Sequence, residues 1–341
     1  MISAEEVTRE EFDEIARRSE ITLPIEQSTY WVKYQSHIDG RSLWRRSEGG
    51  GNLVFKNDDR VMAIGVFLEF ETHGYRFIVC QHGPVWAGEY SVQDEENLAK
   101  VLEGFTRNVD KNIVFARISL RDDIPESAPI LSTVTYDYTV VVSLSKDPEE
   151  ILAGMKPRGR RDVRKSLREC GAECADETRM AYEDFSPYYK VMVETAKRDG
   201  FVPMPSSNYE EMLAILGYDH CRLFAARENG EVKAWSLVTL NSGTAVRYYA
   251  AMQSSAMKMH VTDKLLYTEC CILGAEGIEK YDLMGIGSDF SPTLKGLNEF
   301  KTKFSKDTEK VCPSRDLPIH KTFYSALKAA KKLKSRKSQE G

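Results

Sequence analysis

Residues 296–304 read Gly-Leu-Asn-Glu-Phe-Lys-Thr-Lys-Phe, and they follow the segment Tyr-Asp-Leu-Met-Gly at residues 281–285 across a loop. The run 280–284 is expected to form a β-strand, because a glycine and loop residues end it. Phe300 and Phe304 are four positions apart, so on a helix they share one face. Taken alone, the pattern is typical of two core phenylalanines with Lys301 as a solvated neighbour.

Four further motifs precede this stretch. They are Gln-Ser-Thr-Tyr-Trp-Val-Lys at 27–33, His-Gly-Pro-Val at 82–85, Met-Lys-Pro-Arg-Gly-Arg-Arg-Asp-Val-Arg-Lys-Ser-Leu at 155–167, and Glu-Thr-Ala-Lys-Arg-Asp-Gly-Phe at 194–201. In this order, and together with 281–304, they resemble the Fem transferases, which add amino acids from aminoacyl-tRNA to the peptidoglycan precursor. The resemblance spans residues 27–304, and His82 stands where the family usually has arginine.

A strand and turn layout occurs twice along the chain. Apolar runs at 53–56, 61–70 and 75–80 are separated by turn residues, and 222–226, 232–240 and 245–251 repeat the arrangement. Each set is followed by a helix-like stretch, at 94–108 or 261–275, and by another strand, at 113–119 or 280–284. The sequence therefore predicts two copies of one α+β unit.

That layout is the one of the acetyltransferase-like (GNAT) fold, and the resemblance implies two such domains in tandem. We expect a first domain over 1–145 plus 317–341 and a second over 146–316, with the carboxyl-terminal segment returning to the first. No long heptad stretch is present, so the chain resembles the family's short form, without a coiled-coil insertion.

Composition agrees with two ordinary globular domains. The chain has 341 residues, of which 42% are hydrophobic, and its apolar runs are only strand-sized. No apolar segment follows a basic start at the amino terminus, and the seven cysteines have no metal-like spacing, so we expect reduced thiols and a cytoplasmic location.

Charge is uneven along the chain. The net charge is −5, but seven basic residues and one acid give 321–341 a charge of +6, which leaves −11 for residues 1–320. The basic segment 331–337 is therefore predicted to attract phosphates or anionic lipids rather than to take part in catalysis. Peripheral contact with the inner membrane face is one expectation.

Aminoacyl transfer to an amine passes through a tetrahedral oxyanion and needs no covalent nucleophile, because the ester is already activated. The enzyme must align two substrates and stabilise the developing negative charge. By resemblance, Lys301 is assigned the second task, and Phe300 is assigned to binding the tRNA end, where an aromatic ring can stack on the terminal adenine.

The acceptor carries a diphosphate and sugar, which fixed cations can hold. The resemblance implies that Lys33, with Trp31 in the same motif, contacts the acceptor and that Tyr248 or Tyr249 lines the site. Where the family commonly has an arginine and a tyrosine pair after residue 201, this chain has Met204 and then Tyr209. We therefore include Tyr209 among the expected substrate-binding residues.

A basic run lies between Lys156 and Arg168. Arg160, Arg164 and Arg168 are four residues apart on one predicted helix face, with apolar residues on another. Arg160, Arg164 and Lys165 are candidates for tRNA or phosphate contact. The alternative is an exposed helix that pairs with the acidic body of the protein.

The six histidines are scattered, so we expect no metal site and no cofactor. The predicted function is transfer of an amino acid from aminoacyl-tRNA to the stem peptide of lipid II or of UDP-MurNAc-pentapeptide. An acyl-CoA-dependent N-acyltransferase is the main alternative, although the segments 86–90 and 253–257 lack the glycine-rich pyrophosphate loop of such enzymes. The third hypothesis is a nucleic-acid-binding module without transfer activity.

Overall fold

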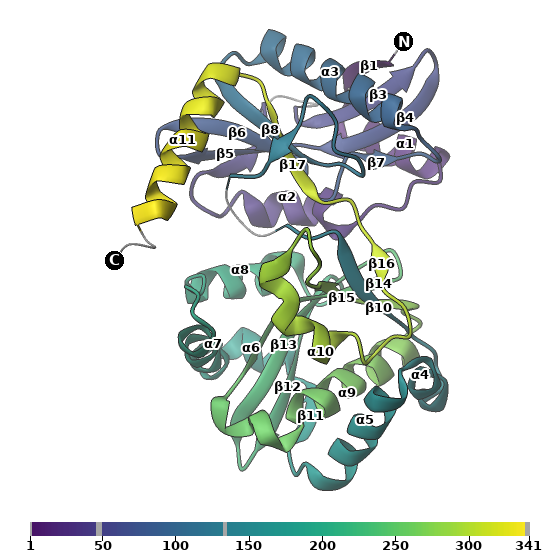
Figure 1. The fold of residues 1–341 in the computed structure, drawn as a ribbon. Coiled ribbons are helices and arrows are strands. Elements are labelled where there is room, and N and C mark those ends of the chain that lie inside the picture. Colours follow the sequence, from purple (N-terminus) through teal and green to yellow (C-terminus); the bar gives the residue numbers. More distant parts are fainter. Residues whose placement is uncertain (1, 46–49, 132–134, 338–341) are drawn as a thin grey trace. The chain divides into compact units, whose positions relative to one another are not determined.

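The structure is a computed structural model, and it describes residues 2–45, 50–131 and 135–337, with side chains described to Leu333. The chain divides into two compact units (Figure 1). Unit 1 consists of Met1–Thr135 and Val311–Gly341, and unit 2 consists of Tyr136–Lys310. Unit 2 is therefore inserted in the chain of unit 1.

Unit 1 combines two sheets with flanking helices. Its elements are β1 (Ile2–Glu6), α1 (Arg9–Arg18), the 3-10 helix η1 (Ile25–Gln27), α2 (Thr29–Gln35), β2 (Arg41–Leu43), β3 (Asn52–Asn57), β4 (Arg60–Val66), β5 (Leu68–Thr72), β6 (Tyr75–Val79), β7 (Val85–Trp86), α3 (Val92–Val109), β8 (Ile113–Ser119), β9 (Ala128–Pro129), β17 (Ser314–Pro318) and α11 (Lys321–Lys337). One sheet has the order β1-β3-β4-β7 and the other β2-β5-β6-β8-β17-β9. Helix α3 begins with a capping box between Ser91 and Asp94 and buries Leu98 and Leu102 in a core that both sheets share.

The apolar run 61–70, expected as one strand, is two strands in two different sheets. Strand β4 pairs with β3, whereas β5 pairs with β2 and β6. Phe67 separates them, because its amide donates to Gly51 O at 2.7 Å and its carbonyl accepts from Trp44 N at 3.1 Å. Apolar content alone does not reveal such a change of partner.

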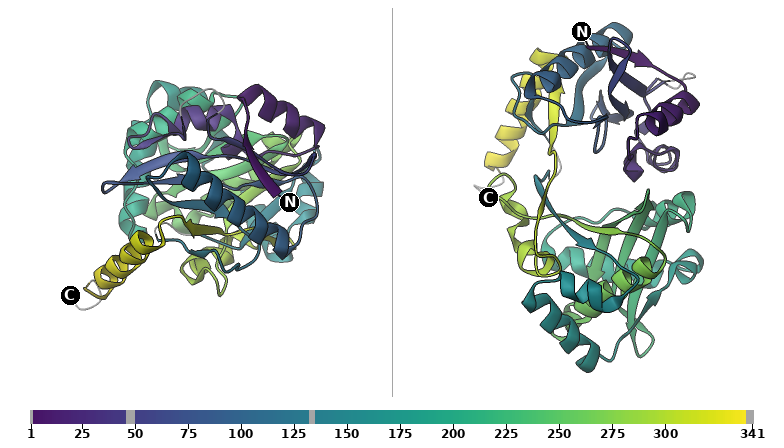
Figure 2. Two further views of the ribbon diagram at one scale, coloured as in Figure 1. Left: turned by 90° about the horizontal axis from the view of Figure 1, so that it is seen from above. Right: turned by 90° about the vertical axis from the view of Figure 1, so that its right-hand side faces the viewer.

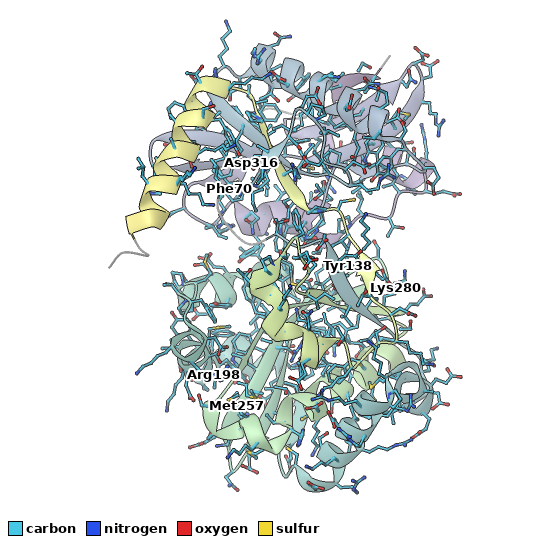
Figure 3. All side chains as sticks on the ribbon, in the orientation of Figure 1. Phe70, Tyr138, Arg198, Met257, Lys280 and Asp316 are labelled. Carbon is cyan, nitrogen blue, oxygen red and sulfur yellow. The ribbon has the colours of Figure 1, made fainter. Side chains whose placement is uncertain are left out.

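The carboxyl-terminal segment completes the larger sheet of unit 1. Strand β17 pairs antiparallel with both β8 and β9. Asp316 on β17, marked in Figure 3, forms a buried ion pair with Arg117 Nε at 2.7 Å and accepts a hydrogen bond from Tyr324 Oη at 3.0 Å. Helix α11 follows at the edge of the unit, where its ribbon projects from the sheet (Figure 2).

Unit 2 is built around one seven-stranded sheet with the order β11-β12-β13-β14-β15-β10-β16. Its elements are β10 (Tyr138–Ser143), α4 (Pro148–Gly154), α5 (Pro157–Glu169), β11 (Glu173–Asp176), α6 (Thr178–Glu183), α7 (Ser186–Asp199), α8 (Ser206–Leu216), β12 (Cys221–Glu228), β13 (Glu231–Asn241), β14 (Thr244–Met252), η2 (Ser254–Met259), α9 (Val261–Ala275), β15 (Lys280–Gly285), η3 (Pro292–Leu297), α10 (Asn298–Lys301) and β16 (Glu309–Lys310). Both units are α+β, with sheets flanked by helices, as the sequence predicted.

Helices cover both faces of this sheet. Strands β12, β13 and β14 form an antiparallel meander, and α9 carries the chain across to β15, which lies parallel to β14. Helix α9 packs with α4 and α5 on the face that carries Ala234 and Val238. On the opposite face, Trp235 donates from Nε1 to Tyr188 O of α7 at 2.8 Å.

Strand β10 pairs with β15 and β16 and so belongs to the sheet of unit 2, although the sequence-based boundary at 145/146 placed it in the first domain. The unit boundaries of the structure, at 135/136 and 310/311, follow this pairing. A strand between two turn-rich segments gives no sign in the sequence of which neighbour it will join.

Candidate functional site

Lys301 lies at the end of β15, where the two halves of the 281–304 pattern meet. Its Nζ donates hydrogen bonds to Gly285 O at 2.8 Å and to Met284 O at 3.2 Å. The short helix α10 supplies the lysine and the strand end supplies the carbonyl oxygens. Lys301 is therefore fixed by backbone groups rather than being the freely solvated lysine that its local sequence suggests.

A local turn presents those carbonyl groups. Met284 has a left-handed backbone conformation, with φ of 62°, and its amide donates to Asp282 Oδ1 at 2.7 Å. Thr139 Oγ1 also donates to this carboxylate. A Cβ at Gly285 would lie 2.3 Å from the ring of Tyr136, so only glycine fits the position. The Asp-Leu-Met-Gly sequence thus builds the acceptor side of the lysine site.

Hydrogen-bonded pairing between β14 and β15 ends beside this point. The parallel register runs from Thr244–Lys280 to Val246–Asp282 and stops there. The next residue on β14 is Arg247, whose side chain is nine-tenths buried and lies 3.4 Å from Glu269 of α9. The end of strand pairing leaves the edges of both strands available to other side chains.

The site is electrostatically unusual. Burial, and to a smaller degree the nearby charge of Arg247, lower the pKa of Lys301 to about 8, although the Asp282 carboxylate acts in the opposite direction. At pH 7 the ammonium form therefore still predominates, by about ten to one. Lys301 is a cation held in a poorly solvated place.

Arg247 belongs to a buried polar cluster that is part of the same core. Glu269 accepts hydrogen bonds from Ser236 Oγ and Tyr281 Oη, each at 2.5 Å. Burial and the Glu269 charge raise the pKa of Tyr281, which keeps this phenol neutral. The cluster connects β13, β14, β15 and α9, and nothing in the sequence motifs had indicated it.

Helix α5 contacts the turn that carries Lys301. Lys303 O accepts a hydrogen bond from Lys156 N at 3.1 Å, and a Cβ at Gly159 would lie 2.1 Å from the same oxygen. Arg158 Nη2 also lies 2.5 Å from Glu299 Oε1 on α10. The 155–167 motif therefore supports the 296–304 motif directly, a contact that sequence reasoning did not anticipate.

Lys303 is buried between two acids. Its Nζ lies 3.4 Å from Asp162 Oδ2 of α5 and forms an ion pair with Asp263 of α9. The same Nζ is 5.1 Å from the Phe300 ring and 5.2 Å from the Phe304 ring. Phe304 is buried and Phe300 partly buried, so of the predicted core pair only Phe304 is fully enclosed.

The predicted tyrosines gather in unit 2. The rings of Tyr209 and Tyr249 meet edge to face at 4.9 Å, and Tyr248 lies 5.5 Å from Tyr249. The register of β14 on β13 passes from Tyr249 to Arg247, so Tyr248 sits in a bulge. Tyr209 is buried against Phe185, and burial, with the Tyr249 phenol, raises its pKa to about 12. Tyr209 therefore packs in the core, whereas both strand tyrosines are partly exposed.

Two predicted residues lie in unit 1. Lys33 is exposed on α2, whereas Trp31 is only 2% exposed and packs against Tyr34. The structural partner of this motif is Gln27, whose side chain accepts from Val66 N and donates to Gln81 O, both at 2.6 Å. Gln27 thereby connects the 27–33 motif with Gln81, the residue that directly precedes the 82–85 motif.

The basic face of α5 is only partly occupied. Arg160 donates to Met155 O at 2.6 Å, which is a structural contact. Arg164 lies 3.6 Å from Glu149, and Lys165 lies 3.8 Å from Glu169. Exposed pairs of this kind contribute little to stability, so both cations remain available to a phosphate.

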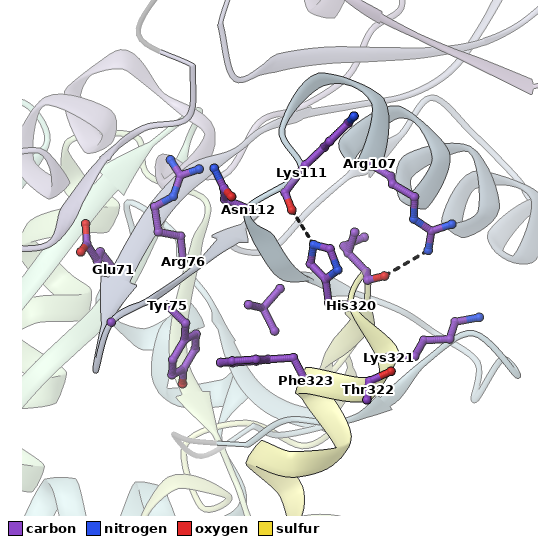
Figure 4. A pocket seen from close by; sticks show the side chains of 13 residues that line it. Glu71, Tyr75, Arg76, Arg107, Lys111, Asn112, His320, Lys321, Thr322 and Phe323 are labelled. Atoms are coloured by element: carbon purple, nitrogen blue, oxygen red, sulfur yellow. Dashed lines mark hydrogen bonds between the residues drawn. The ribbon is translucent and has the colours of Figure 1, made fainter.

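A separate cavity of about 940 Å³ lies in unit 1 (Figure 4). Tyr75 and Phe323 line it with a ring separation of 6.0 Å, and His320 Nε2 lies 2.5 Å from Lys111 O. None of the predicted site residues lines this cavity.

Within the described part of the chain, no group of three or more histidine, cysteine or acidic side chains is placed to hold a metal ion. Of the helices in residues 2–337 that the structure describes, none is both long and apolar enough to cross a bilayer.

Comparison with known proteins identifies the architecture. Residues 157–302 match the model of the acetyltransferase (GNAT) domain. The solved structure of FemX is similar over 95% of this chain and 99% of that chain, with a TM-score of 0.69 and 14% identity. L-PGS from Bacillus licheniformis is similar over 97% of this chain and 98% of that chain, with a TM-score of 0.52 and 13% identity. A tandem GNAT protein from the clavulanic acid biosynthesis pathway is similar over 94% of this chain and 98% of that chain, with a TM-score of 0.50 and 9% identity. A search of curated protein sequences gave no match. The chain therefore has a tandem GNAT fold, and most of its second unit matches the acetyltransferase (GNAT) domain model.

Proposed function

We propose that this protein transfers an amino acid from aminoacyl-tRNA to an amine on the stem peptide of a peptidoglycan precursor, either lipid II or UDP-MurNAc-pentapeptide. The observation that carries the proposal is the position of Lys301, a cation held by two carbonyl groups at the end of β15. The five motifs of the Fem transferases and the FemX-like tandem fold support the same reaction.

The chemistry follows from the donor geometry. The acceptor amine attacks the ester carbonyl carbon of the aminoacyl-tRNA, a C–N bond forms, and the carbonyl oxygen becomes an oxyanion. An ammonium group has three N–H donors, and two of those of Lys301 reach Met284 O and Gly285 O, which leaves the third for the oxyanion. Collapse re-forms the C=O bond and expels the ribose oxygen of the tRNA, which takes up the proton lost by the amine.

Phe300 is proposed to bind the tRNA end. Its ring is only partly buried and lies on the same short helix as Lys301, so a base stacked on it would bring the ester near the ammonium group. Arg164 and Lys165 would contact phosphates of the acceptor stem. Tyr248, Tyr249 and Lys33 are proposed to bind the acceptor.

The alternative, acyl transfer from coenzyme A, is favoured by the match of residues 157–302 to the GNAT domain model. Such enzymes bind a pyrophosphate at the amino terminus of the helix that corresponds to α9. Here the first turn of α9 holds the buried carboxylate of Asp263, paired with Lys303. A pyrophosphate at this helix end would meet an acidic side chain, which favours the tRNA-dependent reaction.

An assay with both donor classes tests the proposal. Purified protein is incubated with a mixture of charged tRNAs and the precursor, and in parallel with acetyl-CoA and the same precursor, and products are read by mass spectrometry. We expect the precursor to gain an amino acid residue only with charged tRNA. Acetylation without aminoacylation would replace the proposal with the coenzyme A reaction.

A further inference from the structure

We infer that α11 is an amphipathic anchor that binds the surface of an anionic membrane. This interaction does not depend on the proposed transfer reaction. It rests on three features of the helix: a stripe of exposed apolar side chains, a high density of basic residues without acids, and, among the side chains described up to Leu333, attachment to unit 1 through the first turns.

The apolar stripe consists of Phe323, Ala326, Ala330 and Leu333. Their spacing of three and four residues places them on one side of the helix. Phe323 is 46% exposed and Leu333 is 61% exposed, and both alanines are exposed as well. Four apolar positions in register on the surface need a partner that accepts apolar side chains.

Attachment to unit 1 is made mainly by residues outside the stripe, although Phe323 of the stripe lies 6.0 Å from the Tyr75 ring. Tyr324 is buried and Leu327 partly buried against the aromatic cluster of Phe77 and Phe115. From Lys328 to Leu333 every side chain is exposed. Figure 4 shows Phe323 at the helix start, beside Tyr75 at the cavity rim, and Figure 2 shows the helix projecting beyond that point. The second half of α11 therefore extends away from the core that holds the first.

The positive charge of α11 indicates that its partner is an anionic surface. The helix contains seven basic residues and no acid: Lys321, Lys328, Lys331, Lys332, Lys334, Arg336 and Lys337. Residues 1–320 carry a net charge of −11. An anionic lipid surface attracts the helix and repels the rest of the chain, so binding would also orient the protein.

Other occupants fit less well. A second copy of α11 would bring two sets of seven like charges together along a stripe of fewer than two heptads. RNA would use the lysines but has no use for exposed Leu333 and the alanines, since base contacts rely on aromatic rings or polar groups. A membrane interface accepts both features, because the apolar side enters the boundary of the acyl chains while the lysines reach the headgroups.

Vesicle sedimentation tests the inference on the full-length protein without substrates. The probes are vesicles of phosphatidylcholine alone and of phosphatidylcholine mixed with phosphatidylglycerol. We expect binding to the mixed vesicles only. The triple variant Lys328→Gln, Lys331→Gln, Lys332→Gln should lose about 100-fold in affinity. Leu333→Asn should lose about 10-fold, since its side chain no longer enters the interface.

Matched controls lie on exposed helix positions of unit 2. Arg179→Gln, Lys190→Gln, Lys197→Gln removes three exposed cations, and Val193→Asn removes an apolar side chain of 45% exposure. Neither control should change vesicle binding by more than about twofold. The inference is overturned if the wild type does not bind mixed vesicles or if controls and α11 variants weaken binding equally. It is also overturned if Leu333→Asn binds the mixed vesicles as tightly as the wild type and the triple lysine variant loses as much affinity for tRNA as for the vesicles. That result would assign the helix to RNA binding.

Discussion

The backbone carbonyl of Lys303 and the amide of Lys156 are joined by a hydrogen bond of 3.1 Å, although more than a hundred residues separate them in the chain. This bond places the start of α5 against the turn that carries Phe300 and Lys301. The orientation of Lys301, the candidate catalytic residue, therefore depends on α5, whose basic sequence is typical of a nucleic-acid-binding helix.

Gly159→Ala tests this support. Alanine normally stabilises a helix interior relative to glycine by up to about 1 kcal/mol. Here its Cβ would lie 2.1 Å from Lys303 O, so we expect a loss of about 1–3 kcal/mol in the free energy of unfolding, together with slower turnover. Urea denaturation measures the first effect. Gly104→Ala is the control, because nothing lies within 4 Å of its Cβ, and it should stabilise the protein.

Lys301→Ala removes the proposed oxyanion donor. Turnover should fall by on the order of 100-fold or more while precursor affinity stays nearly unchanged, since the interaction forms in the transition state. Lys295→Ala alters a lysine of the preceding 3-10 helix with a 56% exposed side chain and should retain activity. Near-normal turnover by a folded Lys301→Ala protein would remove the catalytic assignment.

The activity should fall as pH rises through about 8, because Lys301 must carry its proton to stabilise the oxyanion and its pKa is lowered to about 8. Lys301→Arg keeps a positive charge at all accessible pH values, so in this variant the falling limb should move above pH 10. A pH profile of turnover at saturating substrates compares the two proteins. An unchanged limb in the arginine variant would assign the titration to another group.

Titration of Lys301 should also make the free energy of unfolding depend on pH. The pKa of Lys301 is lower in the folded state than in the unfolded chain, so between about pH 8 and 10.5 the unfolded state binds more protons. Stability should therefore rise with pH across this window in the wild type and stay flat in Lys301→Met. Urea midpoints at several pH values give the two slopes, and parallel slopes would argue against a buried Lys301.

Phe300→Ala should raise the Michaelis constant for aminoacyl-tRNA by about tenfold with a smaller effect on turnover, because stacking contributes to binding. Phe290→Ala removes a ring that is 42% exposed on the preceding loop and serves as the control. Equal effects of both substitutions would show general loss of apolar surface instead of stacking on Phe300.

Asp316→Asn would leave Arg117 buried without its counter-charge. We expect a loss of about 3–5 kcal/mol in the free energy of unfolding. Asp13→Asn breaks an exposed pair with Arg9 and should cost less than about 1 kcal/mol. Thermal or urea unfolding of both variants measures the difference, and similar small losses would show that Asp316 does not hold β17 in place.

The tandem α+β fold could be predicted because apolar runs, turn residues and helix-like stretches are local signals that recur in the same order. The change of partner at Phe67 could not, because it depends on backbone hydrogen bonds to residues distant in sequence. The duplicated layout predicted β3, β6 and β8 of unit 1 and β12 to β15 of unit 2, but neither the remaining strands nor the distribution of strands between sheets.

In the candidate site, too, some features could be predicted from the sequence and others could not. Lys301 and Phe300 could be selected through their motif, but the carbonyl groups that hold the lysine depend on the left-handed turn at Met284. No motif singles out Asp162 and Asp263, the two buried acids that pair with Lys303. Trp31 and Tyr209 were selected as substrate-binding residues and are buried, since an aromatic residue gives the same sequence signal in a core as in a site.

The insertion of unit 2 into the chain of unit 1 sets an order of events during translation. Strand β17 lies between β8 and β9, so β9 has no neighbour on that side until residues 314–318 leave the ribosome. By then all of unit 2 has been synthesised and can fold. Unit 1 is thus the last to be completed, although its chain begins first. A ribosome that stops before residue 314 would release a chain in which unit 2 is complete and the larger sheet of unit 1 has an open edge at β8.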